Sequence, residues 1–100
     1  MKIHLTDIKD IKPYDKNPRK ISDKAIDMVA NSIKEFGFQQ PIVVDMQDEI
    51  VVGHTRYQAS KKLNLKKVPV VRGDFTDEQA KAYRIADNRI NEETGWDYNF

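Results

Sequence analysis

The sequence predicts a small domain of the α+β class, in which short strands and helices alternate along the chain. Three runs of mostly β-branched residues have the composition of buried strands, namely Ile42–Val44, Ile50–Val52 and Val68–Val71. Segments with the helical spacing of apolar residues lie before, between and after these runs. A chain of 100 residues is long enough for one domain with a single modest core.

The N-terminal part is expected to hold a strand, a loop and a helix. Ile3 and Leu5 alternate with polar residues, which predicts a short amphipathic strand. Residues 12–20 contain two prolines, so an extended, rigid loop is expected there rather than regular structure. The helix that follows begins after the N-cap Ser22 and ends at Gly37. Its core-facing stripe consists of Ile26, Val29, Ala30 and Ile33.

The middle of the chain is expected to form a β-hairpin, a second helix and a further strand. The polar turn 46–49 joins the first two apolar runs into the hairpin. The second helix extends from Thr55 to about Leu63, and Asn64 suits the left-handed position that ends it. Pro69 cannot donate a hydrogen bond to a neighbouring strand, so the third run is placed at a sheet edge or at a strand start.

A third helix is expected to begin at Thr76, where Thr76 to Gln79 form a capping box. Its apolar stripe is assigned to Ala82, Tyr83, Ala86 and Ile90. The sequence stops four residues after Trp96, within an aromatic segment. We therefore expect residues 1–100 to be a single domain and a fragment of a longer protein.

The segment from Glu49 to Tyr57 is the strongest candidate for a binding site. A β-branched strand runs through Gly53 into a helix, which leaves the first backbone N–H groups of that helix without partners. These donors and the helix dipole favour an anion, most often a phosphate. Gly53 lets a ligand approach the backbone, and Arg56 can donate two hydrogen bonds to phosphate oxygens. His54 and Thr55 add a ring nitrogen and a hydroxyl group.

An ordinary strand-to-helix turn is the alternative interpretation of this segment. A single glycine is a weaker signal than a full phosphate-binding loop, and the patterns GxGxxG and GxxxxGK[ST] are both absent.

Composition and charge narrow the classes of function. The absence of cysteine excludes disulfides, a thiol nucleophile and cysteine-ligated zinc. No apolar run approaches the roughly 20 residues that cross a bilayer, and the first residues lack the pattern of a signal peptide. We therefore expect a cytoplasmic protein without a membrane partner.

The charges are unevenly distributed along the sequence. Lys and Arg outnumber Asp and Glu by 14 to 9 in residues 1–72, whereas residues 73–100 have 3 against 7. This basic body permits an anionic ligand but falls short of a dedicated DNA-binding face.

Taken in order, these motifs resemble the N-terminal domain of the ParB/sulfiredoxin superfamily. More narrowly, they resemble the ParB-like domains of phages and mobile elements that occur beside DNA methyltransferases. The resemblance covers nearly the whole chain. It rests on Asn17-Pro18-Arg19, Ser32-Ile33, Phe36-Gly37, Gln40-Pro41-Ile42-Val43-Val44, Gly53-His54-Thr55-Arg56, Val68-Pro69-Val70-Val71, Ala86-Asp87-Asn88-Arg89 and Gly95-Trp96-Asp97.

The resemblance implies a small mixed β-sheet with packed helices and a site for a nucleoside triphosphate, CTP or ATP, with Mg²⁺. In this superfamily the box matched by Gly53 to Arg56 cradles the phosphates, and the loop matched by Asn17 to Arg19 approaches them. The cofactor-binding residues implied in this way are Gly53, His54, Thr55, Arg56, Arg19, Asn17 and Gln40. We assign no catalytic residue and no metal ligand among the side chains.

The box also departs from the better-known branches of the superfamily. Partition proteins resemble Gly-Glu-Arg-Arg here, so a CTP-dependent switch is only a candidate for this chain. Sulfiredoxins carry a catalytic cysteine at the position of His54, which excludes their reductase chemistry. Free-serine kinases resemble Gly-His-His-Arg and use a glutamate base in the early loop, where this chain offers only Asp15.

Three functions are therefore compared. The first is a nucleotide-binding regulatory module of a DNA-associated protein. The second is an enzyme, such as an NTPase, a nuclease or a small-molecule kinase. Nuclease chemistry needs clustered carboxylates that hold a metal ion. The candidates are Asp45, Asp48 and Glu49, but they lie at a turn, where acidic residues are common without any catalytic role. The third is a protein-interaction domain with a vestigial pocket, and a homodimer is a further expectation.

DNA binding by this domain alone is expected to be weak, salt-sensitive and independent of sequence. Sequence specificity would then come from a module outside these 100 residues.

Overall fold

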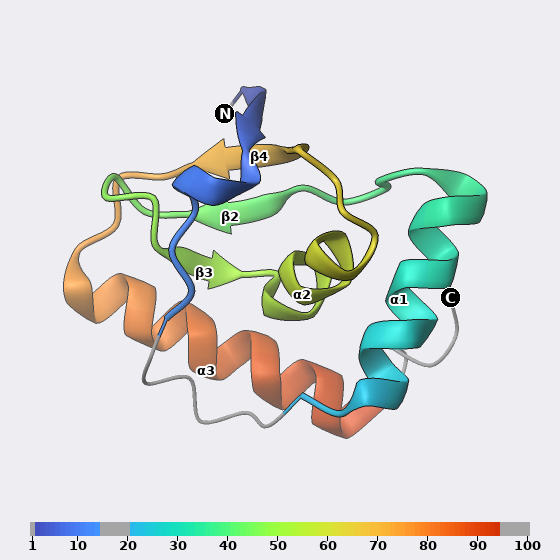
Figure 1. The fold of residues 1–100 in the computed structure, drawn as a ribbon. Coiled ribbons are helices and arrows are strands. Elements are labelled where there is room, and N and C mark those ends of the chain that lie inside the picture. The colour runs from blue at the N-terminus through green and yellow to red at the C-terminus, as the bar shows by residue number, and fades with distance from the viewer. Residues whose placement is uncertain (1, 15–20, 95–100) are drawn as a thin grey trace.

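A computed structural model describes residues 2–14 and 21–94 and shows one open sheet with helices packed around it (Figure 1). The strands follow the order β1-β4-β2-β3 across the sheet, which confirms the α+β class. In chain order the elements are β1 (Ile3–Asp7), the 3-10 turn η1 (Ile8–Asp10), α1 (Asp23–Phe36), β2 (Ile42–Val44), β3 (Ile50–Val52), α2 (His54–Lys62), β4 (Lys67–Arg72) and α3 (Asp77–Thr94).

The sheet is mixed, as the resemblance implied. β2 and β3 form the expected antiparallel hairpin. From β3 the chain continues through α2 and returns as β4, which pairs parallel to β2 and antiparallel to β1. β4 therefore lies inside the sheet and connects β1 to the hairpin.

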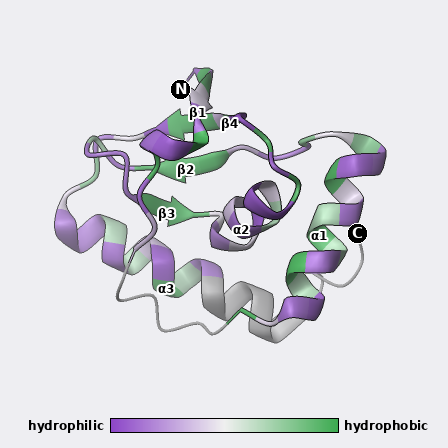
Figure 2. Ribbon diagram, in the orientation of Figure 1, coloured by the Kyte–Doolittle hydropathy of each residue, from purple (hydrophilic) through white to green (hydrophobic). Residues whose placement is uncertain are grey.

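The main core lies on one face of this sheet. Ile42, Val44, Ile50, Val68 and Val70 are almost completely buried there and pack with Tyr57 of α2 and Ile11. In the hydropathy colouring of Figure 2, β2 and β3 are correspondingly green. The apolar runs of the sequence are thus the core strands.

A β-bulge divides the residues of β3 between the two faces. Val43 pairs with Val52 and Val44 pairs with Ile50, so Val51 is the additional residue. Ile50 then joins the main core, whereas Val51 and Val52 pack against Ala80 of α3. The short strand can therefore contact helices on both sides.

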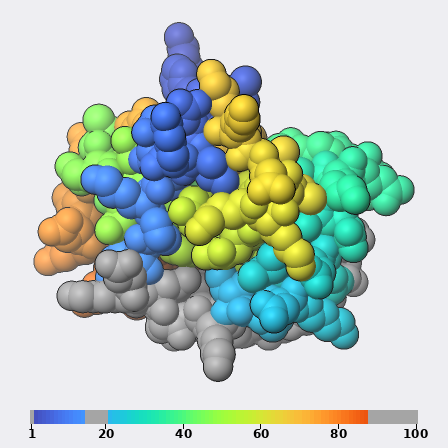
Figure 3. Space-filling model, viewed as in Figure 1, coloured from blue at the N-terminus to red at the C-terminus, as the bar shows by residue number. Residues whose placement is uncertain are grey.

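β1 is a strand as predicted, but its apolar side chains do not face the core. Ile3 and Leu5 are 60% and 71% exposed. Ile3 pairs with Val71, and Val71 pairs with Val43, so these residues share one sheet face. α3 packs against β3 at the opposite edge of that face, and Figure 3 shows the N-terminal strand projecting from the body. The apolar side chains of β1 therefore stay exposed.

Pro69 was expected at a sheet edge or at a strand start, and the edge alternative was wrong, because β4 is an interior strand. Pro69 is opposite Leu5, and the bond from Ile8 N–H to the Lys66 carbonyl places this pair at a non-hydrogen-bonded position of the ladder. On its other side β4 first pairs with β2 at Val70, one residue later. Neither neighbour therefore requires the missing N–H group.

The helix caps follow the sequence prediction closely. Ser22 accepts a hydrogen bond from the N–H of Ala25 at 3.1 Å, and Thr76 and Gln79 form both bonds of the capping box. Gly37 has a positive φ of 77°, although its ψ of −177° is extended rather than helical. α1 packs on α2 through Val29, Ala30 and Ala59 and is scaffold. No helix in the described ranges is long and apolar enough to span a membrane.

The predicted apolar stripe of α3 was wrong for its three members with described side chains. Ala82, Tyr83 and Ala86 are exposed, whereas Ala80 and Arg84 are buried. α3 contacts the sheet at the edge strand β3, where Ala80 meets Val51 and Val52 and Arg84 bonds to a backbone carbonyl. The side chain of Ile90 lies outside the described residues.

Candidate anion-binding site

Gly53 forms the junction between β3 and α2 in a conformation that other residues rarely adopt. Its φ is 109° and its ψ is 27°. A Cβ atom at this position would lie 3.3 Å from both Cα and Cγ1 of Ile42. Glycine is therefore required here both for the backbone angle and for the close approach to β2.

The first turn of α2 begins without a side-chain cap for its backbone N–H groups among the described residues. Its N-cap is Gly53, no side-chain cap bond is present, and the first turn contains no acidic residue. These donors and the positive end of the helix dipole are thus available to an anion. Thr55 is half-buried in this turn and contributes a hydroxyl group.

Arg56 is the cationic side chain of the turn. Its Nε atom is buried and has no hydrogen-bond partner within the described chain. Burial lowers the pKa of Arg56, while Asp87 and Tyr83 of α3 act in the opposite direction. Buried polar groups in proteins are nearly always hydrogen-bonded. The unsatisfied Nε–H is therefore a donor for which a bound ligand could supply the acceptor.

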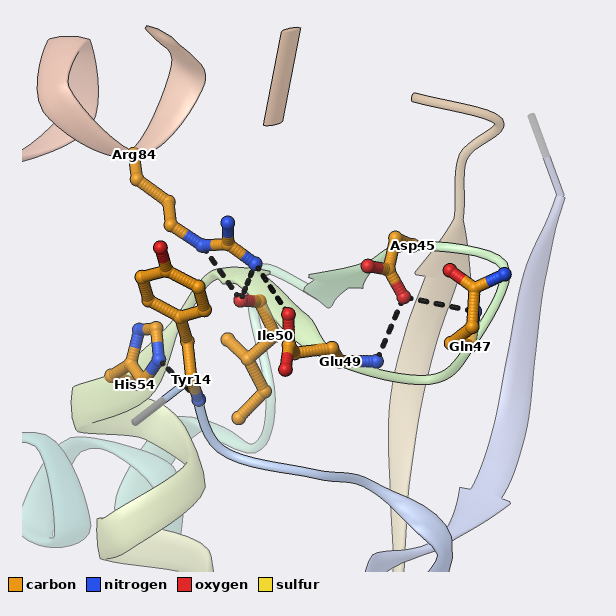
Figure 4. Close-up of polar contacts among 7 residues, drawn as sticks. All are labelled: Tyr14, Asp45, Gln47, Glu49, Ile50, His54 and Arg84. Atoms are coloured by element: carbon orange, nitrogen blue, oxygen red, sulfur yellow. Dashed lines mark hydrogen bonds and ion pairs between the residues drawn. The ribbon is translucent and has the colours of Figure 1, made fainter. Parts of the chain in front are cut away.

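His54 is the first residue of α2 and is in contact with the N-terminal segment. The backbone N–H of Tyr14 donates to Nε2 of His54 across 3.3 Å (Figure 4). Burial, together with the nearby cation of Arg84, lowers the pKa of His54 to about 4. The imidazole is neutral at pH 7.

Arg84 is the residue of this region that the sequence prediction missed. Its side chain is 7% exposed, and Nε and Nη2 donate to the carbonyl oxygen of Ile50 at 3.1 and 2.8 Å. Nη2 lies 3.5 Å from Oε1 of Glu49, and the guanidinium is 3.6 Å from the centre of the Tyr14 ring. The signal that was available is the i, i+4 spacing from Ala80, which places both residues on one helix face.

The segment before Tyr14 is fixed along the outer edge of β3. Lys12 N–H donates to the Asp48 carbonyl at 2.8 Å, and Ile50 N–H donates to the Lys12 carbonyl at 2.9 Å. Together with Arg84 these bonds cover the free edge of the strand. They also bring Tyr14 to the first turn of α2, next to His54 (Figure 4).

The remaining predicted site residues are only partly placed. Asn17 and Arg19 lie outside the described residues. Gln40 is exposed. It lies two positions before Ile42, and Ile42 is the residue that Gly53 approaches. The structure therefore brings together Gly53, His54, Thr55 and Arg56, with Gln40 near the same junction.

The three carboxylates of the nuclease hypothesis have structural partners. Asp45 accepts hydrogen bonds from the N–H groups of Gln47 and Glu49 at 2.9 and 3.0 Å. Asp48 has a φ of 66° and is bonded to Arg72, and Glu49 is paired with Arg84. The described residues contain no group of three or more His, Cys, Asp or Glu that could hold a metal ion.

Comparison with known proteins identifies relatives of this arrangement. The family model of the ParB N-terminal domain matches residues 1–89. The ParB-like nuclease domain-containing protein YnaK of Escherichia coli K12 is 36% identical over 80 residues, which are 79% of this chain and 92% of YnaK.

Two solved structures have a similar fold. The C-terminally truncated chromosome-partitioning protein ParB of Caulobacter crescentus, complexed with CTP-γ-S, superposes with a TM-score of 0.79 at 25% identity. The match covers 88% of this chain and 53% of that one, so the chain spans about half of that ParB structure. Sulfiredoxin of Arabidopsis thaliana superposes with a TM-score of 0.70 at 23% identity, covering 83% of this chain and 97% of sulfiredoxin.

Proposed function

The chain belongs to the ParB N-terminal domain family, and from this premise we propose that it is a nucleotide-binding regulatory module of a DNA-associated protein. The phosphates of the nucleotide bind at the first turn of α2, from Gly53 to Arg56. The observation that carries this proposal is the buried Nε of Arg56, which has no partner within the described chain and lies beside a helix start that no described side chain caps.

Several donors of the first turn suit a triphosphate. The backbone N–H groups after Gly53 bind phosphate oxygens, and the dipole of α2 favours their negative charge. Arg56 adds charge-assisted hydrogen bonds, which are about twice as strong as neutral ones. The absence of an acidic residue in this turn leaves the site without like-charge repulsion from its own helix.

Mg²⁺ fits the carboxylate that lies near this turn. Mg²⁺ is commonly held by one or two carboxylates together with substrate phosphates. Asp87 of α3 acts electrostatically on Arg56, so a carboxylate lies on the side of the turn where the phosphates are proposed to bind. The ion would neutralise charge on the phosphate oxygens. On the family resemblance, Asn17, Arg19 and Gln40 are further proposed ligand contacts; Asn17 and Arg19 lie outside the described residues.

CTP is the first candidate ligand, because the ParB structure of similar fold holds a CTP analogue. ATP is the second candidate, from the resemblance to nucleotide-using members of the superfamily. Calorimetry of the purified chain against CTP, ATP, ADP and GTP, each with and without Mg²⁺, tests the proposal directly. Binding of none of the four would refute it.

The site assignment is tested with Arg56→Ala. Loss of a charge-assisted hydrogen bond of about 1.5–3 kcal/mol weakens binding roughly 10- to 150-fold. Arg72→Ala is the matched control, because Arg72 is bonded to Asp48 in the β2–β3 turn and should leave the affinity unchanged. If Arg56→Ala folds and binds as tightly as the parent, the phosphates lie elsewhere.

Arg19→Ala tests the contribution of the early loop. It should weaken nucleotide binding without lowering the melting temperature. A variant that melts earlier but binds normally would make Arg19 structural.

A nuclease is the alternative suggested by the name of YnaK. The carboxylates of Asp45, Asp48 and Glu49 already have partners within the protein, which argues against a catalytic metal site there. Incubation of supercoiled plasmid with the chain and Mg²⁺ or Mn²⁺ should therefore give no cleavage.

Binding to duplex DNA should be weak and should fall steeply with salt. Nanomolar binding to one sequence at physiological salt would instead make the domain a sequence reader. We assign the domain to a cytoplasmic protein of the phage or mobile-element type on the sequence motifs.

A further inference from the structure

The hydrogen bond between Tyr14 and His54 determines which imidazole nitrogen carries the proton. The backbone N–H of Tyr14 can only donate, and it is directed at Nε2 of His54. A neutral imidazole has one donor and one acceptor nitrogen. Nε2 is therefore unprotonated and Nδ1 carries the hydrogen. Within the described chain, no acceptor is bonded to Nδ1.

Arg84 holds Tyr14 in the position that this bond requires. Its guanidinium carbon lies over the Tyr14 ring, 3.6 Å from the ring centre, in a cation–π contact. Arg84 itself is fixed by its two bonds to the Ile50 carbonyl and by the ion pair with Glu49. The aromatic ring, and with it the backbone N–H next to His54, is thereby attached to the edge of β3.

The charges around His54 come from three elements. Arg84 approaches from α3, Glu49 lies beside Arg84 in the residue before β3, and Arg56 follows on α2 itself. Arg84 disfavours a second positive charge on the imidazole, and burial acts in the same direction. The Tyr14 N–H further opposes protonation of Nε2, because it would then face another donor.

We propose that His54 binds the anionic ligand as a neutral imidazole, through Nδ1–H, and that Arg84 is a positioning residue that acts on His54 through Tyr14. The identity of the ligand rests on the proposed function, whereas the tautomer and its dependence on Arg84 are properties of the free protein. His54 then adds a neutral donor to the backbone N–H groups of the first turn. Affinity does not depend on protonation of His54 and should not increase on acidification from pH 8 to pH 6.

The first experiment determines the tautomer in the free, ¹⁵N-labelled chain. The sequence contains two histidines, His4 and His54, so the spectrum of His54→Asn assigns both. Long-range ¹H–¹⁵N correlations at pH 7 should show His54 as a single species with a protonated Nδ1 and a bare Nε2. A doubly protonated ring, or a proton on Nε2, would overturn the proposal whether or not nucleotide binds.

The second experiment tests the positioning role. Arg84→Met should abolish the single-tautomer signal of His54, because Tyr14 is no longer held over α2. Tyr14→Ala keeps the backbone N–H and all bonds of Arg84 to β3, and it should have the same effect even if Arg84→Met folds poorly. Arg72→Met, at the far end of the hairpin, should leave the signal unchanged. Retention of one tautomer in Tyr14→Ala would refute the role of Arg84 and Tyr14.

The third experiment tests the donor with CTP and Mg²⁺ as the probe. The side-chain amide of Asn can place a donor near the position of Nδ1, whereas that of Gln reaches the position of Nε2. His54→Asn should therefore bind CTP more tightly than His54→Gln, by up to about tenfold for one neutral hydrogen bond. Equal losses, or a tighter His54→Gln, would remove Nδ1 as a ligand donor. Failure of the parent to bind would refute the proposed function and the donor role, but would not alter the tautomer result.

Discussion

Replacement of Gly53 by alanine should destabilise the domain at the point where the candidate site begins. The methyl group must adopt a φ of 109° and lie 3.3 Å from two atoms of Ile42. Ile42 is completely buried in the interior strand β2, and one of the two contacted atoms is its Cα. Neither the backbone of β2 nor the first turn of α2 can move away without loss of packing.

The expected size follows from two additive effects. A left-handed conformation costs a non-glycine residue about 1–2 kcal/mol. Overpacking against a buried strand adds about 1–3 kcal/mol. The sum of about 2–5 kcal/mol corresponds to a melting temperature lowered by roughly 10–30 °C in a domain of this size. Urea denaturation followed by circular dichroism measures the loss directly.

Gly37→Ala is the matched control for Gly53→Ala. Gly37 also has a positive φ, of 77°, but no atom of the described residues lies within 4 Å of the position of a Cβ there. It should therefore show only a backbone cost of about 1–3 kcal/mol. If Gly53→Ala is no less stable than Gly37→Ala, the close approach to Ile42 does not constrain the junction. Folded Gly53→Ala should also bind CTP more weakly, because the first turn of α2 is displaced.

Three further predictions concern stability. Arg84→Ala should lower the free energy of unfolding by about 2–4 kcal/mol, because it leaves a buried carbonyl without its charged donor. Arg72→Ala removes an ion pair whose side chains are 33% exposed, and it should cost less than about 1 kcal/mol in the same urea titration. Leu5→Ala should cost less than about 0.5 kcal/mol of stability, because Leu5 is exposed. Ile42→Ala should cost about 2–5 kcal/mol, because Ile42 is fully buried. A loss in Leu5→Ala as large as that in Ile42→Ala would contradict the exposure of β1. The pKa of His54 is lowered from 6.5 to about 4, so its contribution to stability is complete above pH 6.5 and is lost as the pH falls toward 4. In urea titrations, the free energy of unfolding should therefore fall less from pH 7 to pH 5 in His54→Asn than in the parent.

Features that depend on neighbouring residues were predictable from the sequence. The caps at Ser22 and Thr76, the β2–β3 hairpin and the left-handed Asn64 all follow from short-range hydrogen bonding and backbone preference. The junction at Gly53 belongs to the same class, since a strand, a glycine and a helix are adjacent in sequence. The first turn of α2 was therefore located correctly, and its role as a ligand site stays a prediction.

Features that depend on strand order could not be predicted locally. The exposure of Leu5 and the interior place of Pro69 follow from the pairing of β1 with β4. Arg84 resembles a solvated helix residue until α3 is packed against β3, where the outward carbonyl of Ile50 requires a donor. Arg84 is buried because it donates to the carbonyl of Ile50, an edge-strand residue 34 positions away in the sequence.

The interior position of β4 also sets the order in which the sheet can assemble. Among the described strands β4 comes last in the sequence, yet it is the one that joins β1 to the β2–β3 hairpin. Ile3 must meet Val71, and a loop roughly ten times longer than a hairpin connection costs about 2 kcal/mol more in closure entropy. During synthesis β1 therefore has no strand partner until Arg72 has left the ribosome. Folding should begin at the hairpin and end at β1, so substitutions in β1 should accelerate unfolding more than they slow folding.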